Sequence, residues 1–135
     1  MTLPALPDGL VVIVKRECET CRMVVPVIEQ LTNGPLPVTV YVQDDSAFPE
    51  SLAPIHDADL SISWHYDIET VPTVLRIENG VEVERTVGWV RDEWQRVTDQ
   101  SGLGPQLSAF RPGCGSLSVD QRVTRSPSAP ITMLA

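Results

Sequence analysis

The sequence predicts an α/β domain in which helices flank a central mixed β-sheet. Three stretches lead to this prediction: an apolar run at residues 10–14, a β-branched run at residues 38–42, and a hairpin pattern at residues 73–87. Strands joined by a helix run parallel, whereas the two strands of a hairpin run antiparallel. We therefore expect both kinds of pairing in one sheet, with the elements in the order β-α-β-α-β-β-α.

The first strand and the first helix form the most informative stretch of the chain. The continuous apolar run at residues 10–14 is typical of a strand that is buried on both faces. The helix that follows has apolar residues spaced along one core-facing side, namely Val24, Val27, Ile28 and Leu31. Pro26 lies inside this helix and removes the hydrogen bond to the Arg22 carbonyl, so we expect a kink there.

The middle of the chain alternates between one clear strand and less regular elements. Residues 38–42 are rich in β-branched and aromatic side chains, which indicates a second strand. Residues 43–54 are typical of a loop. A short helix is expected at residues 59–66 with Asp59 as its N-cap, although the alternating apolar residues there would also suit a strand.

The hairpin and the last helix complete the predicted domain. Asn79-Gly80, between two alternating runs, is a strong signal for a hairpin with a type I′ turn. Residues 91–100 are typical of an amphipathic helix, with Trp94 and Val97 on the side that faces the core.

The amino-acid composition of the sequence changes after this helix. From residue 103 onward, prolines, serines and glycines replace the periodic apolar residues. Such a stretch does not supply enough apolar surface to build a core of its own. We therefore expect a folded domain at residues 8–101 and a mostly disordered tail at residues 102–135, which contains Cys114.

Composition and charge limit the classes of partner. The 135 residues are 42% hydrophobic and 21% charged, which is typical of a globular protein with one domain. The formal net charge is −8. Nucleic acids and anionic membranes bind clustered Lys and Arg, so we expect no nucleic acid and no membrane as partner. Proteins or small thiols are the expected partners.

The N-terminal stretch bears on the location of the protein. Pro4, Pro7 and Asp8 precede a short apolar run, and no basic leader or long apolar core accompanies them. This is not the pattern of a signal peptide, and no apolar stretch has the length of a membrane span. We expect a cytoplasmic protein, because a Cys-x-x-Cys is kept there as a dithiol that acts transiently.

Cys18 and Cys21 are the candidate catalytic pair. Residues three apart lie on the same face of a helix, so their sulfurs can form a reversible disulfide. A helix N-terminus lowers the pKa of a thiol from about 8.5, because backbone N–H groups and the helix dipole favour the anion. We therefore expect Cys18 to be the nucleophile and Cys21 the resolving thiol, with no bound cofactor.

Two other interpretations of this pair stay open. A Cys-x-x-Cys is half of a structural zinc site, and the chain offers only Cys114, His56 and His65 as further ligands. The two thiols could also be inert or merely structural. Direct entry from an apolar strand favours redox chemistry, so we expect no bound metal.

Several separated motifs together resemble the thioredoxin family over about residues 8–101. They are the dithiol Cys18-Glu19-Thr20-Cys21, Pro26, the segment Val71-Pro72-Thr73, the turn Asn79-Gly80, and Gly88. The resemblance implies a thioredoxin-like fold and a thiol–disulfide oxidoreductase. Such an enzyme reduces protein disulfides through a mixed disulfide, and an external reductase then restores its dithiol.

The resemblance also implies a substrate site across from the dithiol. It implies that the bond before Pro72 is cis and that the Val71 backbone hydrogen-bonds an extended substrate; the alternative is a trans proline that opens an ordinary edge strand. Gly88 would leave room for the substrate backbone. Trp89 would either offer the substrate a flat apolar contact or pack beside Trp94 under the last helix.

Three positions depart from the family pattern. Glu17 stands in place of a typical Trp, Glu19-Thr20 in place of Gly-Pro, and Val12 in place of a buried aspartate. The acidic rim disfavours acidic partners. Without the buried carboxylate, Cys21 has no evident base, so resolution is slow or depends on water or a glutamate. These departures support an alternative function, a thioredoxin-fold binding or adaptor module with weak or no redox turnover.

Cys114 lies in the sequence Arg-Pro-Gly-Cys-Gly-Ser of the predicted tail. A flexible tail of this length can reach across the domain. Cys114 is therefore either an auxiliary thiol that returns to Cys18 or Cys21, an anchor for a partner, or a bystander.

Overall fold

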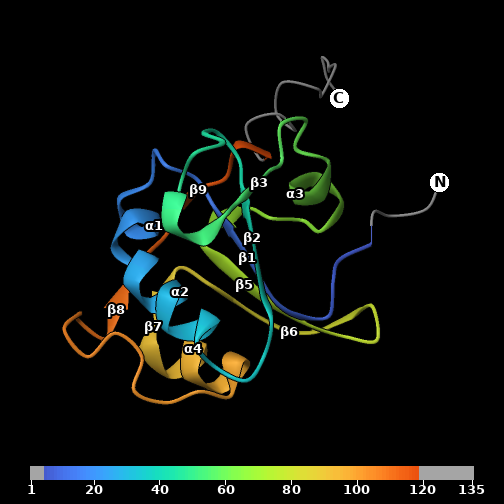
Figure 1. Ribbon diagram of the computed structural model, residues 1–135. Coiled ribbons are helices and arrows are strands. Elements are labelled where there is room, and N and C mark those ends of the chain that lie inside the picture. Colours follow the sequence, from blue (N-terminus) through green and yellow to red (C-terminus); the bar gives the residue numbers. More distant parts are fainter. Residues whose placement is uncertain (1–4, 119–135) are drawn as a thin grey trace, which may run out of the picture.

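A five-stranded mixed sheet forms the centre of the computed structural model, which describes residues 5–118 (Figure 1). The strand order is β3-β2-β1-β5-β6. The central strand β1 (Gly9–Val14) pairs parallel with β2 (Val38–Val42) and antiparallel with β5 (Thr73–Glu78). At the edges, β3 (Ile55–His56) pairs parallel with β2, and β6 (Val81–Val87) pairs antiparallel with β5. The predicted α/β architecture with a central mixed sheet is confirmed.

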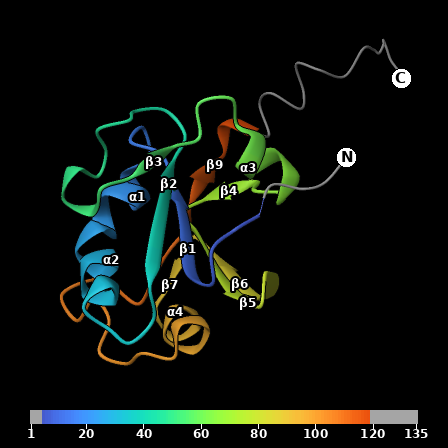
Figure 2. The same cartoon turned by 45° about the vertical axis from the view of Figure 1, so that its right-hand side comes forward.

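Helices flank this sheet on both sides. Figure 2 shows α1 (Glu19–Met23) and α2 (Val25–Thr32) on one side and α3 (Ser61–His65) on the other. The last helix, α4 (Arg91–Thr98), packs against β5 and β6. A single 3₁₀ turn, η1 (Glu50–Leu52), interrupts the predicted loop between β2 and β3.

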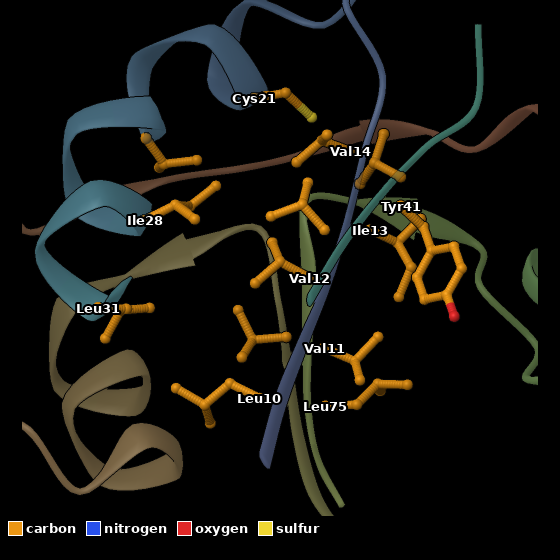
Figure 3. Close-up of a cluster of buried hydrophobic side chains, with 14 of the residues drawn as sticks. Leu10, Val11, Val12, Ile13, Val14, Cys21, Ile28, Leu31, Tyr41 and Leu75 are labelled. Carbon is orange, nitrogen blue, oxygen red and sulfur yellow. The ribbon is translucent and has the colours of Figure 1, made fainter. Parts of the chain in front are cut away.

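The core forms around β1, whose six residues are all buried. Neighbouring side chains of a strand point to opposite faces. Val12 accordingly points toward α2 and lies on the same side as Ile28, whereas Val11 points to the opposite face, the side of Leu75 (Figure 3). Because both faces of β1 are covered, its C-terminal end is a rigid support for the loop that carries Cys18.

The predicted kinked helix is two separate helices. Val24 ends α1 and begins α2, with φ −88° and ψ 0°, so the axis breaks two residues before Pro26. Pro26 lies in the first turn of α2, where the missing N–H would have had no helical partner. The prediction of a proline effect is confirmed, but its result is a helix boundary that leaves the Cys-x-x-Cys on a short helix of its own.

The short helix in the middle of the chain is α3, so the helical interpretation of this stretch is confirmed. Its predicted N-cap is wrong. Leu60, with φ 60°, occupies the N-cap position, and the carboxylate of Asp57 accepts hydrogen bonds from the Ser63 N–H at 2.9 Å and the Ser63 hydroxyl at 2.7 Å. The carboxylate of Asp59 accepts a hydrogen bond from the Ser61 N–H, at 3.1 Å.

The hairpin turn has the predicted form. Asn79 and Gly80 both have positive φ, 55° and 77°, as a type I′ turn requires. The two carboxylate oxygens of Asp8 accept hydrogen bonds from the N–H groups of Asn79 and Gly80, at 3.0 and 2.9 Å. The N-terminal stretch therefore holds the hairpin from outside the sheet.

The first part of the predicted tail is folded. Residues 103–118 fold back over the domain in two short ladders. Strand β7 (Trp89–Val90) pairs with β8 (Phe110–Arg111), and β4 (Thr70–Val71) pairs with β9 (Cys114–Gly115), both antiparallel. The rest of the predicted tail, residues 119–135, lies outside the described residues.

Polar contacts, together with the fully buried side chain of Leu103, hold this stretch in place. The Gln43 side-chain amide donates to the Ser116 hydroxyl at 2.8 Å and accepts from the Leu117 N–H at 3.0 Å. The Arg91 guanidinium donates to the carbonyl groups of Leu103 and Gly104, at 3.0 and 2.8 Å. Such contacts leave no periodic pattern in the sequence, which is why a disordered tail was expected.

Candidate active site

Cys18 begins helix α1, directly after the loop that follows β1. It is the N-cap residue, with extended backbone angles (φ −142°, ψ 113°), and its sulfur accepts a hydrogen bond from the Cys21 N–H at 3.3 Å. Cys21 lies one turn further on and is fully buried. The two thiols are free and close together, as their spacing predicts.

The surroundings of Cys18 favour its thiolate. They lower its pKa from 9.0 to about 5. The largest cause is the hydrogen bond from the Cys21 side chain; burial opposes it, and the Cys114 side chain and the N–H groups of Cys21 and Thr20 contribute further. Hydrogen bonds to an anion stabilise the anion, so Cys18 is ionised at neutral pH.

Cys21 has the opposite tendency. Burial, and secondarily its hydrogen bond to Cys18, raise the pKa of Cys21 far above its ordinary value. Figure 3 shows its sulfur pointing from α1 toward the end of β1. The groups that shift the pKa of Cys21 include no carboxylate. Val12, which stands in place of a buried aspartate, is a fully buried apolar residue. Cys21 is therefore a proton donor to Cys18 rather than a second anion.

The segment around Pro72 lies against the dithiol. The Val71–Pro72 peptide bond is cis, and the Sγ of Cys18 lies 3.6 Å from the carbonyl oxygen of Val71. The N–H of Gly88 donates to the carbonyl of Pro72 at 2.8 Å. Four of the residues singled out from the sequence, Cys18, Val71, Pro72 and Gly88, are thus brought together with Cys21 at one end of the sheet.

Trp89 does not take part in this arrangement. Its side chain is fully buried, and its ring meets that of Trp94 edge to face with centroids 5.2 Å apart. The indole N–H donates to the carbonyl of Ser108 at 2.7 Å. The expectation of a substrate contact is therefore wrong, and the alternative, packing beside Trp94, is what the structure has.

A third thiol, Cys114, completes the site. In the β4–β9 ladder Cys114 is the register partner of Val71. Burial, and secondarily the neighbouring Cys18 thiol, raise the pKa of Cys114. Cys114 therefore lies near enough to Cys18 for the two thiols to affect each other's pKa, and Cys18 is the acidic member.

The chain around Cys114 covers the dithiol. We call residues 111–115 the return segment, because the chain returns there to the site. The Thr20 hydroxyl donates to the carbonyl of Pro112 at 2.7 Å, and Lys15 Nζ donates to the carbonyl of Gly115 at 2.6 Å. With the return segment in place, Cys18 is only 1% exposed.

Sequence reasoning missed the return segment, although one signal for it was present. Arg111 precedes Cys114 by three residues, and the motif Glu19-Thr20 lies between the two cysteines of the dithiol. In the structure Arg111 forms an ion pair with Glu19, and its Nε donates to the Thr20 hydroxyl at 3.1 Å. The basic Arg111 near Cys114 and the acidic Glu19 between the two cysteines could therefore have suggested an ion pair between these segments.

The described residues also form a pocket away from the dithiol, but no metal-binding cluster and no membrane-spanning helix. A pocket of about 240 Å³, lined in part by Asp8, Leu36 and Arg76, lies at the opposite end of β1 from the dithiol. Within residues 5–118, no group of three or more His, Cys, Asp or Glu side chains is arranged to hold a metal ion. No helix in that range is long and apolar enough to cross a membrane.

The fold and the site define a class: an α/β protein with a central mixed sheet, in which a Cys-x-x-Cys at a helix N-terminus lies beside a cis-proline segment. No family model matches the chain, and no curated protein matches it.

Solved structures similar to the chain include two thioredoxins. The reduced thioredoxin pre-protein of Schistosoma mansoni has 20% identity and a TM-score of 0.48, over 68% of this chain and 78% of that one. Malassezia sympodialis thioredoxin has 24% identity and a TM-score of 0.47, over 68% and 74%. StoA from Bacillus subtilis has 14% identity and a TM-score of 0.48, over 61% and 76%. The chemistry of the site is derived below from this chain's own residues.

Proposed function

We propose that the protein is a thiol–disulfide oxidoreductase that reduces disulfides of other proteins through Cys18 and Cys21. The observation that carries this proposal is the position of Cys18, an N-cap thiol with its pKa lowered to about 5, 3.6 Å from the Val71 carbonyl. A thiolate is the attacking form in thiol–disulfide exchange, and an extended peptide can pair with exposed strand backbone.

The reaction has two exchange steps. The Cys18 thiolate attacks one sulfur of a substrate disulfide; a mixed disulfide forms, and the other substrate sulfur leaves as a thiolate. Cys21 then loses its proton and attacks the Cys18 sulfur, which releases the second substrate sulfur and forms the Cys18–Cys21 disulfide. The substrate gains two electrons, and an external reductase returns two electrons to the protein. The two sulfurs carry these electrons, so no bound cofactor takes part.

The backbone around the cis-proline would align the substrate. Once the return segment is displaced, Val71 would offer its main chain to an extended peptide, and Gly88, which has φ 69° and no side chain, would leave room for the peptide to approach. The reducing cytoplasm suits this role, because the dithiol is restored there after each cycle.

Insulin reduction in the presence of dithiothreitol tests the proposal. The protein is expected to accelerate insulin precipitation above dithiothreitol alone, and Cys18→Ser is expected to remove the acceleration. Cys21→Ser is expected to accumulate a mixed disulfide with insulin that is visible on a non-reducing gel. A Cys18→Ser variant as active as the unaltered protein would refute the role of Cys18.

One observation favours a second candidate function, a binding or adaptor module with slow turnover. Burial raises the pKa of Cys21 and no carboxylate counters it, so Cys21 is a poor attacking group and the mixed disulfide persists. The same assay separates the two functions. An adaptor gives a stable mixed disulfide without insulin precipitation, whereas the oxidoreductase gives precipitation and a short-lived adduct.

A further inference from the structure

The return segment lies where the proposed function places a substrate strand. It is extended, and its strand β9 pairs antiparallel with β4, so that Cys114 faces Val71 and Gly115 faces Thr70. The segment enters through the β7–β8 ladder, in which Arg111 faces Trp89. Adding a strand to exposed backbone is a recurring mode of peptide recognition. Here the peptide is part of the same chain.

Two glycines make this close approach possible. A Cβ atom added to Gly113 would lie 2.4 Å from the Val71 carbonyl oxygen and 2.6 Å from the Thr70 side chain. A Cβ atom on Gly88 would lie 3.0 Å from the Gly113 nitrogen. Two backbones therefore meet at distances that any larger residue at position 113 would prevent. By contrast, a Cβ atom on Gly115 would meet nothing within 4 Å.

The return segment also matches the rim of the dithiol in charge and hydrogen bonding. Glu19 pairs with Arg111, and Thr20, which is 2% exposed, binds both the Arg111 guanidinium and the Pro112 carbonyl. These contacts hold the segment in register on the two residues that lie between the cysteines. The pairing places Cys114 opposite Val71, whose carbonyl oxygen lies 3.6 Å from the Sγ of Cys18.

We propose that the return segment is a built-in substrate of the site and that Cys114 forms a disulfide with Cys18 when the protein is oxidised, locking the segment over the dithiol. This inference rests on the proposed function in one respect, the role of Cys18 as the nucleophile. Cys114 then takes the place that a substrate cysteine would have.

A small disulfide such as oxidised glutathione supplies the oxidant. The Cys18 thiolate attacks it, a Cys18–glutathione bond forms, and one glutathione thiolate leaves. Cys114 then loses its proton and attacks the Cys18 sulfur, forming the Cys18–Cys114 bond and releasing the second glutathione thiolate. The protein loses two electrons and the oxidant gains them. Cys114 is partly exposed and can pass its proton to water, whereas Cys21 is fully buried.

Peptide mapping after oxidation by oxidised glutathione tests the proposal. Free thiols are blocked with N-ethylmaleimide, and the protein is digested with trypsin without reduction. Cys18 and Cys21 fall in the peptide 17–22, and Cys114 falls in the peptide 97–122, because trypsin does not cleave before Pro112. We expect the two peptides to be joined by a disulfide, and the link to persist in Cys21→Ser and to vanish in Cys18→Ser.

Two glycine variants test whether the Cys18–Cys114 disulfide requires the return segment to be paired with β4 or forms by random collision of the two thiols. Gly113→Ala clashes with the Val71 backbone, whereas Gly115→Ala is a matched control with open space. We expect the linked fraction to fall about tenfold in Gly113→Ala, which corresponds to seating weakened by about 1.4 kcal/mol. The fraction is expected to stay unchanged in Gly115→Ala. Equal yields in the two variants would overturn the seated-strand explanation.

The outcomes distinguish this inference from the proposed function. If Cys114 is recovered with N-ethylmaleimide while the peptide 17–22 holds an internal disulfide, the inference is wrong even when insulin is reduced. If the two peptides are linked but neither the unaltered protein nor Gly113→Ala accelerates insulin reduction, the inference stands and the proposed function is wrong.

Discussion

The acidity of Cys18 leads to a prediction whose magnitude follows from the site. A thiol with a pKa of about 5 is about 99% ionised at pH 7, whereas one at the ordinary value of 9.0 is about 1% ionised. Only the thiolate is alkylated at an appreciable rate. The rate of alkylation of Cys18 by iodoacetamide is therefore expected to rise with pH through a midpoint of about 5. The return segment lowers the absolute rate by covering Cys18, and its Cys114 contributes to the low midpoint.

Substitutions at Cys21 test the cause of the shift. The hydrogen bond from the Cys21 side chain is the largest contribution. Cys21→Ala removes the donor, so the midpoint is expected to move upward toward 9.0. Cys21→Ser keeps a hydroxyl donor and is the matched control, for which the midpoint stays closer to that of the unaltered protein. The assay is mass spectrometry of the peptide 17–22 after timed alkylation at a series of pH values.

Two results would refute this reasoning. A midpoint near 9 in the unaltered protein would mean that Cys18 is an ordinary thiol. A midpoint that stays near 5 in Cys21→Ala would mean that the helix N-terminus or Cys114, and not Cys21, stabilises the anion.

The same shift implies a dependence of stability on pH. The pKa of Cys18 is lower in the folded than in the unfolded protein, so between pH 5 and 9 the folded state binds fewer protons. The free energy of unfolding of the reduced protein is therefore expected to rise with pH across this window, and the contribution is lost as pH falls through about 5. Urea denaturation at pH 5, 6.5 and 8 measures it. An equally steep rise in Cys18→Ser would assign the dependence to other groups.

Three further substitutions test the packing around the site. Trp89→Ala is expected to lower the free energy of unfolding by about 3–5 kcal/mol, since it empties a fully buried position against Trp94; a loss below about 1 kcal/mol in urea denaturation would contradict this. Asp57→Ala leaves the buried Ser63 N–H and hydroxyl without their acceptor and is expected to cost about 1–3 kcal/mol by the same measurement, whereas Asp57→Asn retains an acceptor and is the milder control. Gly80→Ala is expected to lower the free energy of unfolding by about 1 kcal/mol, because alanine is strained at a φ of 77°. No atom lies within 4 Å of the added methyl group, so steric contact adds nothing to this loss. Unchanged thermal stability would argue against this reasoning.

Local signals account for the parts of the fold that were predictable. The five residues of β2 lie at their predicted positions, because a β-branched run between a helix and a loop needs no information from elsewhere in the chain. The turn at Asn79-Gly80 requires positive φ at both residues, and few other dipeptides tolerate it. The dithiol at the start of α1 was equally visible, because spacing and helix polarity are local properties.

Strands of two residues were not predictable. Strands β4, β7, β8 and β9 have no periodicity of their own, and each exists only because a distant partner supplies its hydrogen bonds. The same holds for Trp89: its position next to Gly88 in sequence suggested the substrate site, but the edge-to-face contact with Trp94 and the bond to Ser108 place it in the core. For Trp89, the tertiary contacts decide the position of the side chain, and its nearness to Gly88 in the sequence does not.

One departure from the thioredoxin pattern, Glu19-Thr20, has a structural role. Glu19 and Thr20, which stand where the family typically has Gly-Pro, are the residues that hold Arg111 and Pro112 of the return segment. Gly-Pro has neither a carboxylate nor a hydroxyl and would provide none of these contacts. The acidic rim, which from sequence alone only disfavoured acidic partners, is thus complementary to a basic residue of the same chain. The two residues between Cys18 and Cys21 thus hold the segment that carries Cys114, and their substitution by Gly-Pro is expected to free the return segment while leaving the dithiol in place.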